Sequence, residues 1–197
     1  PHVVRTLAAW ERPALGMAVE LLEGASAVGG PPNFDSVTRD TFTEGKHERL
    51  TARQAHQVAL VVARAGAWLH ERGLMHGDVY LHNTLRVAAA AAAAPTTGKR
   101  RRGSQAEGGD AAGDSDDVVR LSDLGAACAY DRTRHPQLEA LEVLSYGWLV
   151  LDLLSWLAQD DDEGGARLIE TMRSVAEACT SSATPKFASA VKQLEGA

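Results

Sequence analysis

The sequence is poor in cysteine and has no excess of positive charge. Its 197 residues include two cysteines, Cys128 and Cys179, which do not stand at the spacing of a metal or redox motif. Neither a disulfide framework nor a zinc site is therefore expected, and we expect an intracellular, cytoplasmic protein from a reducing compartment. Lys and Arg number 20 and Asp and Glu 26, for a formal charge of -6. This balance argues against nucleic acid as the main partner.

The sequence also lacks a long hydrophobic run. Its longest apolar segment, Val143–Ala158, is short for a membrane span and carries Asp152 near its middle. We therefore expect no membrane span and interpret the segment as a buried core helix. No signal peptide is visible, and the chain begins with Pro1, so we expect its natural N-terminus to lie upstream.

The composition that remains, with 45% hydrophobic residues, suits one globular domain with a sizeable core. His2–Trp10 and Met17–Gly24 are predicted strands with a short connection, which favours an antiparallel pair. Thr51 and Gln54 fit a capping box, and apolar residues at helical spacing follow them. A helix is therefore predicted for residues 52–72.

Short strands and helices alternate in the second half of the chain. TLRV at 84–87 and VVRLS at 118–122 are predicted strands that can pair as a hairpin. After the core helix, Glu163–Gly165 is expected to break the chain before an amphipathic helix over Ala166–Cys179. Thr184–Pro185 is predicted to start the last helix, with proline in its first turn.

Residues 88–117 separate the two strands of that hairpin. They comprise an alanine run closed by Pro95, the basic run Lys99–Arg102, and a tail rich in Gly, Ser and Asp. Low hydrophobicity and blocks of like charge predict a disordered insert. The insert costs little stability, because closure entropy grows only logarithmically with loop length. The basic run fits a nuclear-localisation patch, a phosphate-binding tail or, most simply, a solvated charged loop.

Two short segments carry the polar residues that suggest chemistry. HGDVYLHN, residues 76–83, places Asp78 and Asn83 on one tight loop, and SDLG, residues 122–125, places Asp123 at the end of a strand. Phosphoryl transfer needs a carboxylate to orient the attacking hydroxyl and oxygen ligands to hold Mg²⁺. Asp78 fits the base, while Asn83 and Asp123 fit the metal ligands. Taken singly, each is an ordinary turn residue, and only their joint spacing argues for a site.

The two segments resemble the protein kinase superfamily. H-x-D-x-x-x-x-N is similar to the kinase catalytic loop, and D-L-G is similar to the metal-binding D-F-G. The resemblance extends outward in the family's order and covers nearly the whole chain apart from the insert. MAVELLEG (17–24) looks like the fifth strand and hinge, EVLSYGWLVLD (142–152) like the buried central helix, and TPKFASAVKQLEG (184–196) like the closing helix.

The resemblance implies a fold, a set of ligands and a set of roles. It implies an α+β protein-kinase-like fold, mainly the α-helical C-lobe (25–197) with the last strands of the N-lobe (1–24), and a chain that starts downstream of the phosphate clamp. ATP and Mg²⁺ are the implied cofactors. Val19 would be the gatekeeper, the Glu20 C=O and Leu22 N–H would bond adenine, and Leu85 would floor the adenine pocket or simply pack in the core. His76 is expected to be structural.

Several positions depart from the family pattern. Gly77 replaces the catalytic-loop arginine, so a phosphorylated activation loop would lack its usual docking charge. Tyr80 replaces the lysine that touches the transferred phosphate, and His82 is placed to substitute partly for it. There is no A-P-E motif, and Thr184 stands where its arginine partner would be. Both halves of one buried ion pair are thus missing together, which is coherent because a single buried charge is costly.

ATP-dependent phosphoryl transfer to a protein hydroxyl, Ser or Thr rather than Tyr, is the function that these features favour. Two alternatives stay open at this point. One is a pseudokinase that senses nucleotide or acts as a scaffold. The other is a small-molecule kinase of the aminoglycoside or choline type, which H-G-D-x-x-x-x-N and the short activation segment also resemble.

Overall fold

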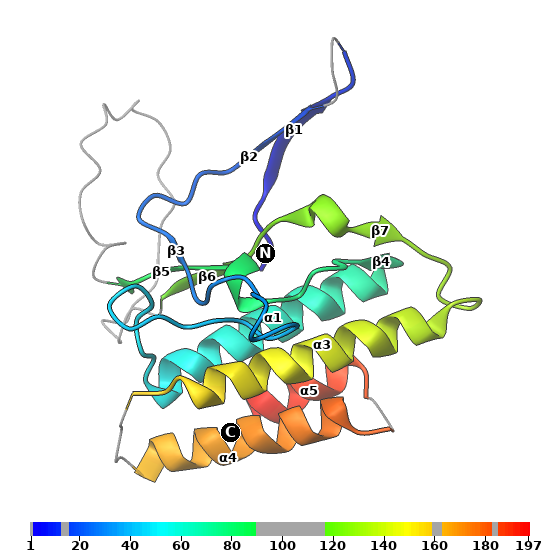
Figure 1. The fold of residues 1–197 in the computed structure, drawn as a ribbon. Helices are drawn as coiled ribbons and strands as arrows, with labels where there is room; N and C mark the ends of the chain where they lie inside the picture. The colour runs from blue at the N-terminus through cyan, green and yellow to red at the C-terminus, as the bar shows by residue number, and fades with distance from the viewer. Residues whose placement is uncertain (1, 13–15, 90–116, 159–162, 183–184) are drawn as a thin grey trace, which may run out of the picture.

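The computed structural model describes residues 2–12, 16–89, 117–158, 163–182 and 185–197. Most of the predicted insert, residues 90–116, lies outside these ranges, as does Thr184. The described residues form a body of helices and small sheets, from which a two-stranded hairpin projects (Figure 1). Helices and strands are thus both present, in agreement with the predicted α+β class.

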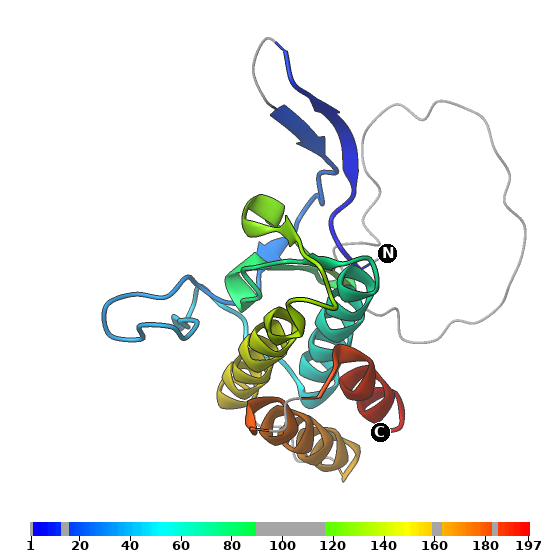
Figure 2. The same ribbon diagram turned by 90° about the vertical axis from the view of Figure 1, so that its right-hand side faces the viewer.

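Four helices make up most of the body. They are α1 (Ala52–Glu71), α3 (Pro136–Ser155), α4 (Glu163–Thr180) and α5 (Phe187–Glu195). Helix α1 packs against the other three, and α4 lies along α3 (Figure 2). Their shared core is closely filled, with buried apolar side chains that include Val58, Val62, Tyr146, Leu149, Met172 and Phe187.

Helix α1 begins where the capping box predicted it. The Gln54 N–H donates to Thr51 Oγ1 at 3.3 Å, and the Thr51 N–H donates to Gln54 Oε1 at 3.0 Å, so both free donors are satisfied. Gly66 lies inside the helix, where a Cβ would overlap the ring of Phe187. The glycine weakens the helix locally but allows α5 to pack closely against it.

Three predicted helix boundaries were wrong. Helix α3 begins at Pro136, well before Val143, because its first two turns contain polar helix formers that an apolar pattern does not detect. Glu163–Gly165 forms the first turn of α4 and does not break the chain. The cost of glycine is smaller at a helix end than in the interior. The last helix begins at Phe187, after Pro185, with Lys186 as its N-cap.

The strands of the described residues form three small antiparallel sheets. In the projecting hairpin, β1 (Thr6–Trp10) pairs with β2 (Gly16–Val19), as predicted. A three-stranded sheet has the order β3 (Ser26–Ala27), β5 (Thr84–Val87), β6 (Val118–Leu121), which confirms the predicted pairing of β5 and β6. The third sheet pairs β4 (Leu74–Met75) with β7 (Cys128–Ala129). Helix α1 packs against β6.

Asp117 joins the described residues on either side of positions 90–116. Its carboxylate accepts hydrogen bonds from Arg86 Nε and from the Ala89 N–H, and its backbone carbonyl accepts one from Gln57 Nε2 at 2.8 Å. Arg86 is 6% exposed and also bonds Glu48. Asp117, which lay inside the predicted disordered insert, is therefore part of the folded body.

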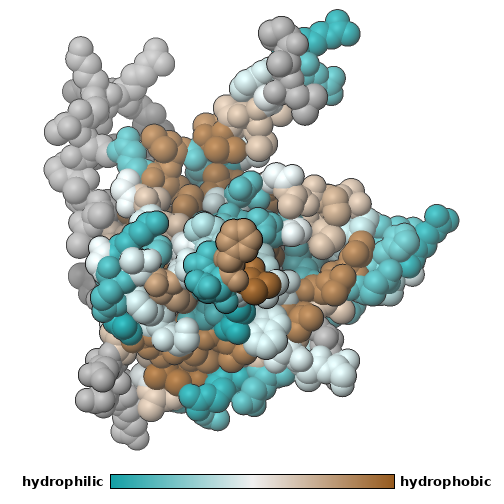
Figure 3. Space-filling view, viewed as in Figure 1, coloured by the Kyte–Doolittle hydropathy of each residue, from teal (hydrophilic) through white to brown (hydrophobic). Residues whose placement is uncertain are grey.

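The hairpin and the body differ in exposure. All of β1 is exposed, and apolar side chains gather at the foot of the hairpin, where it meets the body (Figure 3).

Among the helices in the described part of the chain, none combines the length and the apolar character needed to cross a bilayer.

Candidate functional site

The loop between β4 and β5 brings Asp78 and Asn83 together. A short 3₁₀ turn, η1 (Leu81–Asn83), folds the loop back, so that Asn83 Nδ2 donates to the Asp78 carbonyl at 3.0 Å and to Asp78 Oδ2 at 2.8 Å. Asn83 is 5% exposed, whereas the Asp78 side chain is 39% exposed. The loop therefore holds one carboxylate rigidly and leaves it accessible to a substrate.

His76 ties this loop to the end of β6. It is fully buried, its Nδ1 accepts the Asp78 N–H at 3.3 Å, and its Nε2 lies 2.9 Å from the Ser122 carbonyl oxygen. Burial lowers the pKa of His76, although the bond to Ser122 and nearby carboxylates oppose this effect. A neutral ring satisfies both bonds, with the hydrogen on Nε2. The structural role predicted for His76 is confirmed.

Asp123 follows Ser122 and has a left-handed backbone, with φ 59° and ψ 73°. Non-glycine residues in this region are uncommon and concentrate at functional sites. Asp123 Oδ1 accepts the Gly125 N–H at 3.1 Å, and the residue is exposed. The Ser122 N–H and Oγ both donate to the Asn83 carbonyl at 2.8 Å. The two segments singled out by sequence are therefore joined directly.

A cavity of about 500 Å³ lies where the hairpin meets the body, within the size range of ligand sites. It is mostly apolar and is lined by all four residues predicted to bind adenine and by Asp123; the four are Val19, Glu20, Leu22 and Leu85. Asp78 and Asn83 are not lining residues and lie on the adjoining loop. Among the described residues, neither the Glu20 carbonyl nor the Leu22 N–H has a hydrogen-bond partner. Both groups are thus available to a ligand.

Sequence reasoning missed Val4, Met17 and Leu124 as further apolar walls of the cavity. Val4 is placed by a hydrogen bond from its N–H to the Leu121 carbonyl at 2.8 Å. Apolar residues in strands and turns give no signal that separates a cavity wall from the core, so the sequence could not have identified them.

The oxygens at this site suit Mg²⁺ better than a transition metal. Asn83 Oδ1 and Asp123 Oδ2 accept no hydrogen bond from the described residues, so both can act as ligands. In that same part of the chain, no group of three or more His, Cys, Asp or Glu residues could hold an ion by itself. Mg²⁺ commonly takes one or two protein oxygens and completes its shell with water and phosphate.

Glu142 is a further residue that sequence reasoning did not assign to the site. It lies buried on α3, where its Oε1 accepts the Gly77 N–H at 2.7 Å and its Oε2 lies 2.7 Å from His70 Nε2. The carboxylate therefore holds the start of the loop against the central helix. A charged residue at the head of an apolar helix was the available signal, because such a charge is buried only with partners.

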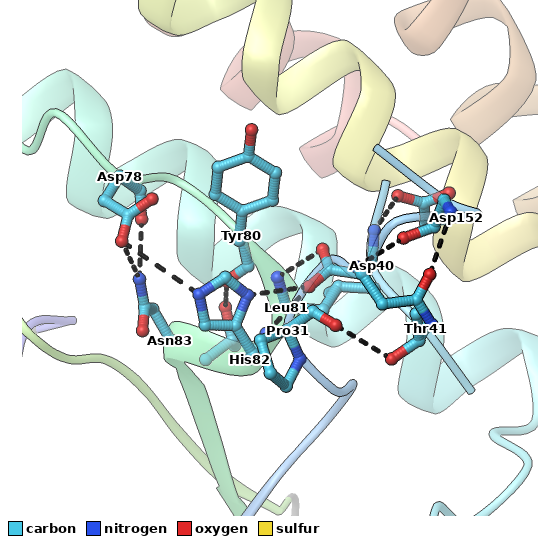
Figure 4. A network of polar contacts seen from close by, with 12 residues as sticks. Pro31, Asp40, Thr41, Asp78, Tyr80, Leu81, His82, Asn83 and Asp152 are labelled. Atoms are coloured by element: carbon cyan, nitrogen blue, oxygen red, sulfur yellow. Dashed lines mark hydrogen bonds and ion pairs between the residues drawn. The ribbon is translucent and has the colours of Figure 1, made fainter. Parts of the chain in front are cut away.

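Asp40 holds the other end of the loop. Its side chain is 0% exposed and accepts the N–H groups of Leu81 at 2.8 Å and His82 at 3.1 Å (Figure 4). Asp152 on α3 in turn accepts the Asp40 N–H at 3.3 Å and bonds Arg39. Asp40 belongs to a segment that the sequence predicted only as loop, and nothing in its local pattern marked it.

The departures from the family pattern have a structural counterpart at Gly77. Its φ is 80°, and a Cβ at this position would overlap the carbonyl oxygen of Ala126. The backbone at the end of η2 (Leu124–Ala126) therefore occupies the space into which a larger side chain would extend. An arginine at position 77 is incompatible with this arrangement.

The segment between η2 and α3 is short and well bonded. The Tyr130 N–H donates to the Gly73 carbonyl at 2.9 Å, and both Tyr130 Oη and Arg132 Nε donate to Glu139, at 2.9 and 2.7 Å. Burial and the bond to Glu139 raise the pKa of Tyr130. These contacts hold the segment against Gly73 and helix α3.

Comparisons with known proteins bear on the fold. No protein-family model and no curated protein matches this sequence. The solved structure of the Rad53 kinase domain and SCD2 is similar to this chain, with a TM-score of 0.55 and 12% sequence identity, over 98% of this chain and 69% of that one. The fold is kinase-like. At so low an identity, the kinase-like fold leaves the chemistry to be argued from the site.

Proposed function

We propose that this chain is the catalytic part of an ATP-dependent phosphotransferase that acts on a hydroxyl group, Ser or Thr of a protein being the leading acceptor. In this proposal, residues 1–24 are the last strands and hinge of a kinase N-lobe, and residues 25–197 form the C-lobe. The observation that carries the proposal is the cavity, which unites Val19, Glu20, Leu22, Leu85 and Asp123 beside the Asp78–Asn83 loop.

Each residue has a role that its surroundings support. The free Glu20 carbonyl and Leu22 N–H recognise the adenine edge, while Val19 and Leu85 contact its faces. Asp78, held by Asn83 and accessible on one side, orients the attacking hydroxyl and accepts its proton. Asn83 Oδ1 and Asp123 would hold Mg²⁺, which, when bound, neutralises charge on the phosphates. Positioning supplies most of this catalysis, in agreement with a loop fixed at both ends.

Two observations favour alternatives. Of the described residues that line the cavity, none is Lys or Arg, which favours a nucleotide-binding scaffold without turnover. The short segment between η2 and α3 leaves a reduced platform for a peptide, which favours a small hydroxyl compound as the acceptor.

Substitution of the two aspartates in the protein that contains this chain separates the enzyme from the scaffold. Asp78→Asn should lower phosphoryl transfer by about 1000-fold and change Mg·ATP affinity little, because Asp78 acts on the hydroxyl. Asp123→Asn should weaken Mg·ATP binding by about tenfold or more, roughly 1.4 kcal/mol, because a ligand charge is lost. Asn83→Ala should lower both phosphoryl transfer and Mg·ATP affinity, each by less than the aspartate variant that affects it most. Calorimetry measures the affinity, and a radiolabel assay with protein and small hydroxyl acceptors measures the transfer.

Asp35→Asn is a matched control, since Asp35 is exposed and does not line the cavity. Equal transfer by the wild-type protein and Asp78→Asn would refute the enzyme proposal. Loss of Mg·ATP affinity in Asp123→Asn, with no transfer in any variant, would identify a scaffold.

A further inference from the structure

His82 has one ring nitrogen bound to Asp40 and the other directed at Asp78 (Figure 4). Nδ1 lies 2.9 Å from Asp40 Oδ1, and Nε2 lies 4.0 Å from Asp78 Oδ2. The His82 side chain is 20% exposed, so the ring is packed on one side and accessible on the other. The ring of Tyr80 stacks on it with a centroid separation of 5.2 Å.

The Asp40 carboxylate fixes which ring nitrogen carries a hydrogen. It already accepts the N–H groups of Leu81 and His82, and a carboxylate oxygen has no hydrogen to donate. Nδ1 must therefore donate to Asp40. The buried charge cannot rotate away without losing three bonds at once, so the orientation of the ring is set from below the loop.

The orientation of the ring places His82 Nε2 close to Asp78 Oδ2. A single oxygen atom can lie within hydrogen-bonding distance of both Nε2 and Asp78 Oδ2, because each bond spans about 2.8 Å and the two atoms are 4.0 Å apart. With the ring hydrogen on Nδ1, Nε2 and Asp78 Oδ2 are both hydrogen-bond acceptors, so a substrate hydroxyl at that point can donate its one hydrogen to either of them but not to both at once. Asn83 Nδ2 donates to the same oxygen, Asp78 Oδ2, at 2.8 Å, so a hydrogen bond from the hydroxyl would be the second that this oxygen accepts.

We propose that Asp40 is a positioning residue for phosphoryl transfer: it orients His82 so that Nε2 contacts the acceptor hydroxyl beside Asp78. The inference rests on the proposed function. Asp40 does not touch the acceptor and acts through His82. The path from the core runs from Asp152 on α3 to Asp40, then to His82, and ends at the base.

A double-mutant cycle on Asp40 and His82 tests this proposal in the protein that contains the chain. Asp40→Asn should lower kcat by about tenfold and leave KM for ATP unchanged, since Asp40 lies away from the cavity. His82→Asn keeps a side-chain N–H for Asp40 but removes Nε2, and it should lower kcat to a similar extent. In the His82→Asn background, Asp40→Asn should then have no further effect on kcat.

Equal losses of kcat from Asp40→Asn in both backgrounds would overturn the proposal, because they would mean that Asp40 acts only through the loop backbone. Thr41→Val is the matched control. It removes a neighbouring bond, from Thr41 Oγ1 to the Pro31 carbonyl at 3.0 Å, that does not involve the catalytic loop. It should leave kcat unchanged.

Nitrogen NMR of the His82 ring gives a result that does not depend on activity. The wild-type ring should carry its hydrogen on Nδ1, and Asp40→Asn should shift it toward Nε2. The signals are assigned by their loss in His82→Asn. If the wild-type protein transfers no phosphate, the proposed function fails while the spectrum still reports on the ring. If the hydrogen is on Nε2 in the wild type, the positioning role of Asp40 is refuted even in an active enzyme.

Discussion

The helical body and the β1–β2 hairpin differ in how they are held. Ten of the 20 residues of α1 are buried, whereas every residue of β1 is exposed. At the foot of the hairpin, its two arms are joined by bonds from the Glu20 N–H to the Arg5 carbonyl at 2.9 Å and from the Arg5 N–H to Glu20 Oε1 at 2.8 Å, and the Val4 N–H donates to the Leu121 carbonyl of the body at 2.8 Å. Stability therefore resides in the body, while the hairpin contributes one side of the cavity. The predictions below test this division.

The largest difference between the two regions should appear when one aromatic side chain is removed from each. Phe187→Ala should destabilise the fold by about 3–5 kcal/mol, because it empties a site packed against Gly66 and Tyr146. Trp10 in the hairpin is 46% exposed. Trp10→Ala should therefore lower the free energy of unfolding by less than about 0.5 kcal/mol. Chemical denaturation measures both. Similar losses would show that the hairpin shares the body's core.

A smaller difference in stability is expected between a substitution at Asp117, on the edge of the body, and deletion of residues 90–116. Asp117→Ala should cost about 2 kcal/mol, because Arg86 stays buried with only the exposed Glu48 as its partner. Deletion of residues 90–116, with a short turn joining Ala89 to Asp117, should leave the melting temperature nearly unchanged. A loss of several degrees on deletion would contradict this prediction.

The smallest effect concerns His76, at the junction of the loop with β6. Its pKa is lowered from 6.5 in the folded state, so the unfolded chain binds more protons below that pH. The free energy of unfolding should therefore fall as the pH drops below about 6.5, until the folded pKa is reached. His76→Gln should remove this part of the pH dependence. Trp10→Ala, as a control, should keep the pH dependence of the wild-type protein. An unchanged slope in His76→Gln would assign the effect to other groups.

Elements with a strong local signal could be predicted from the sequence. The capping box at Thr51, the helix after it and the pairing of β5 with β6 all follow from short-range patterns, and the structure contains them. The boundaries of α3, α4 and α5 could not be predicted as well. The starts of α3 and α4 lie in polar or glycine-rich turns that an apolar pattern does not detect, and the start of α5 depends on packing between distant residues, as Phe187 docks on Gly66.

The residues of the candidate site also divide into those that local motifs identify and those that only long-range contacts reveal. Motif spacing located the loop of Asp78 and Asn83 and the turn at Asp123, and the cavity contains the residues that the kinase resemblance placed at the hinge. Spacing could not locate Asp40, because its partners at 81 and 82 lie 41 and 42 residues away in the chain. Long-range carboxylates that fix a loop leave no local pattern, although a buried acid in an apolar helix, such as Glu142, is a partial sign.

The geometry at Gly77 limits how this loop can change by mutation. A single replacement by arginine would introduce both a side chain at positive φ and an overlap with Ala126. Introduction of the arginine found in the common kinase loop would first require a change that moves the backbone at Ala126, so the order of substitutions is constrained. Relatives that keep a short segment after Asp123 should therefore keep glycine at this position, and an engineered arginine should be accepted only together with a longer segment.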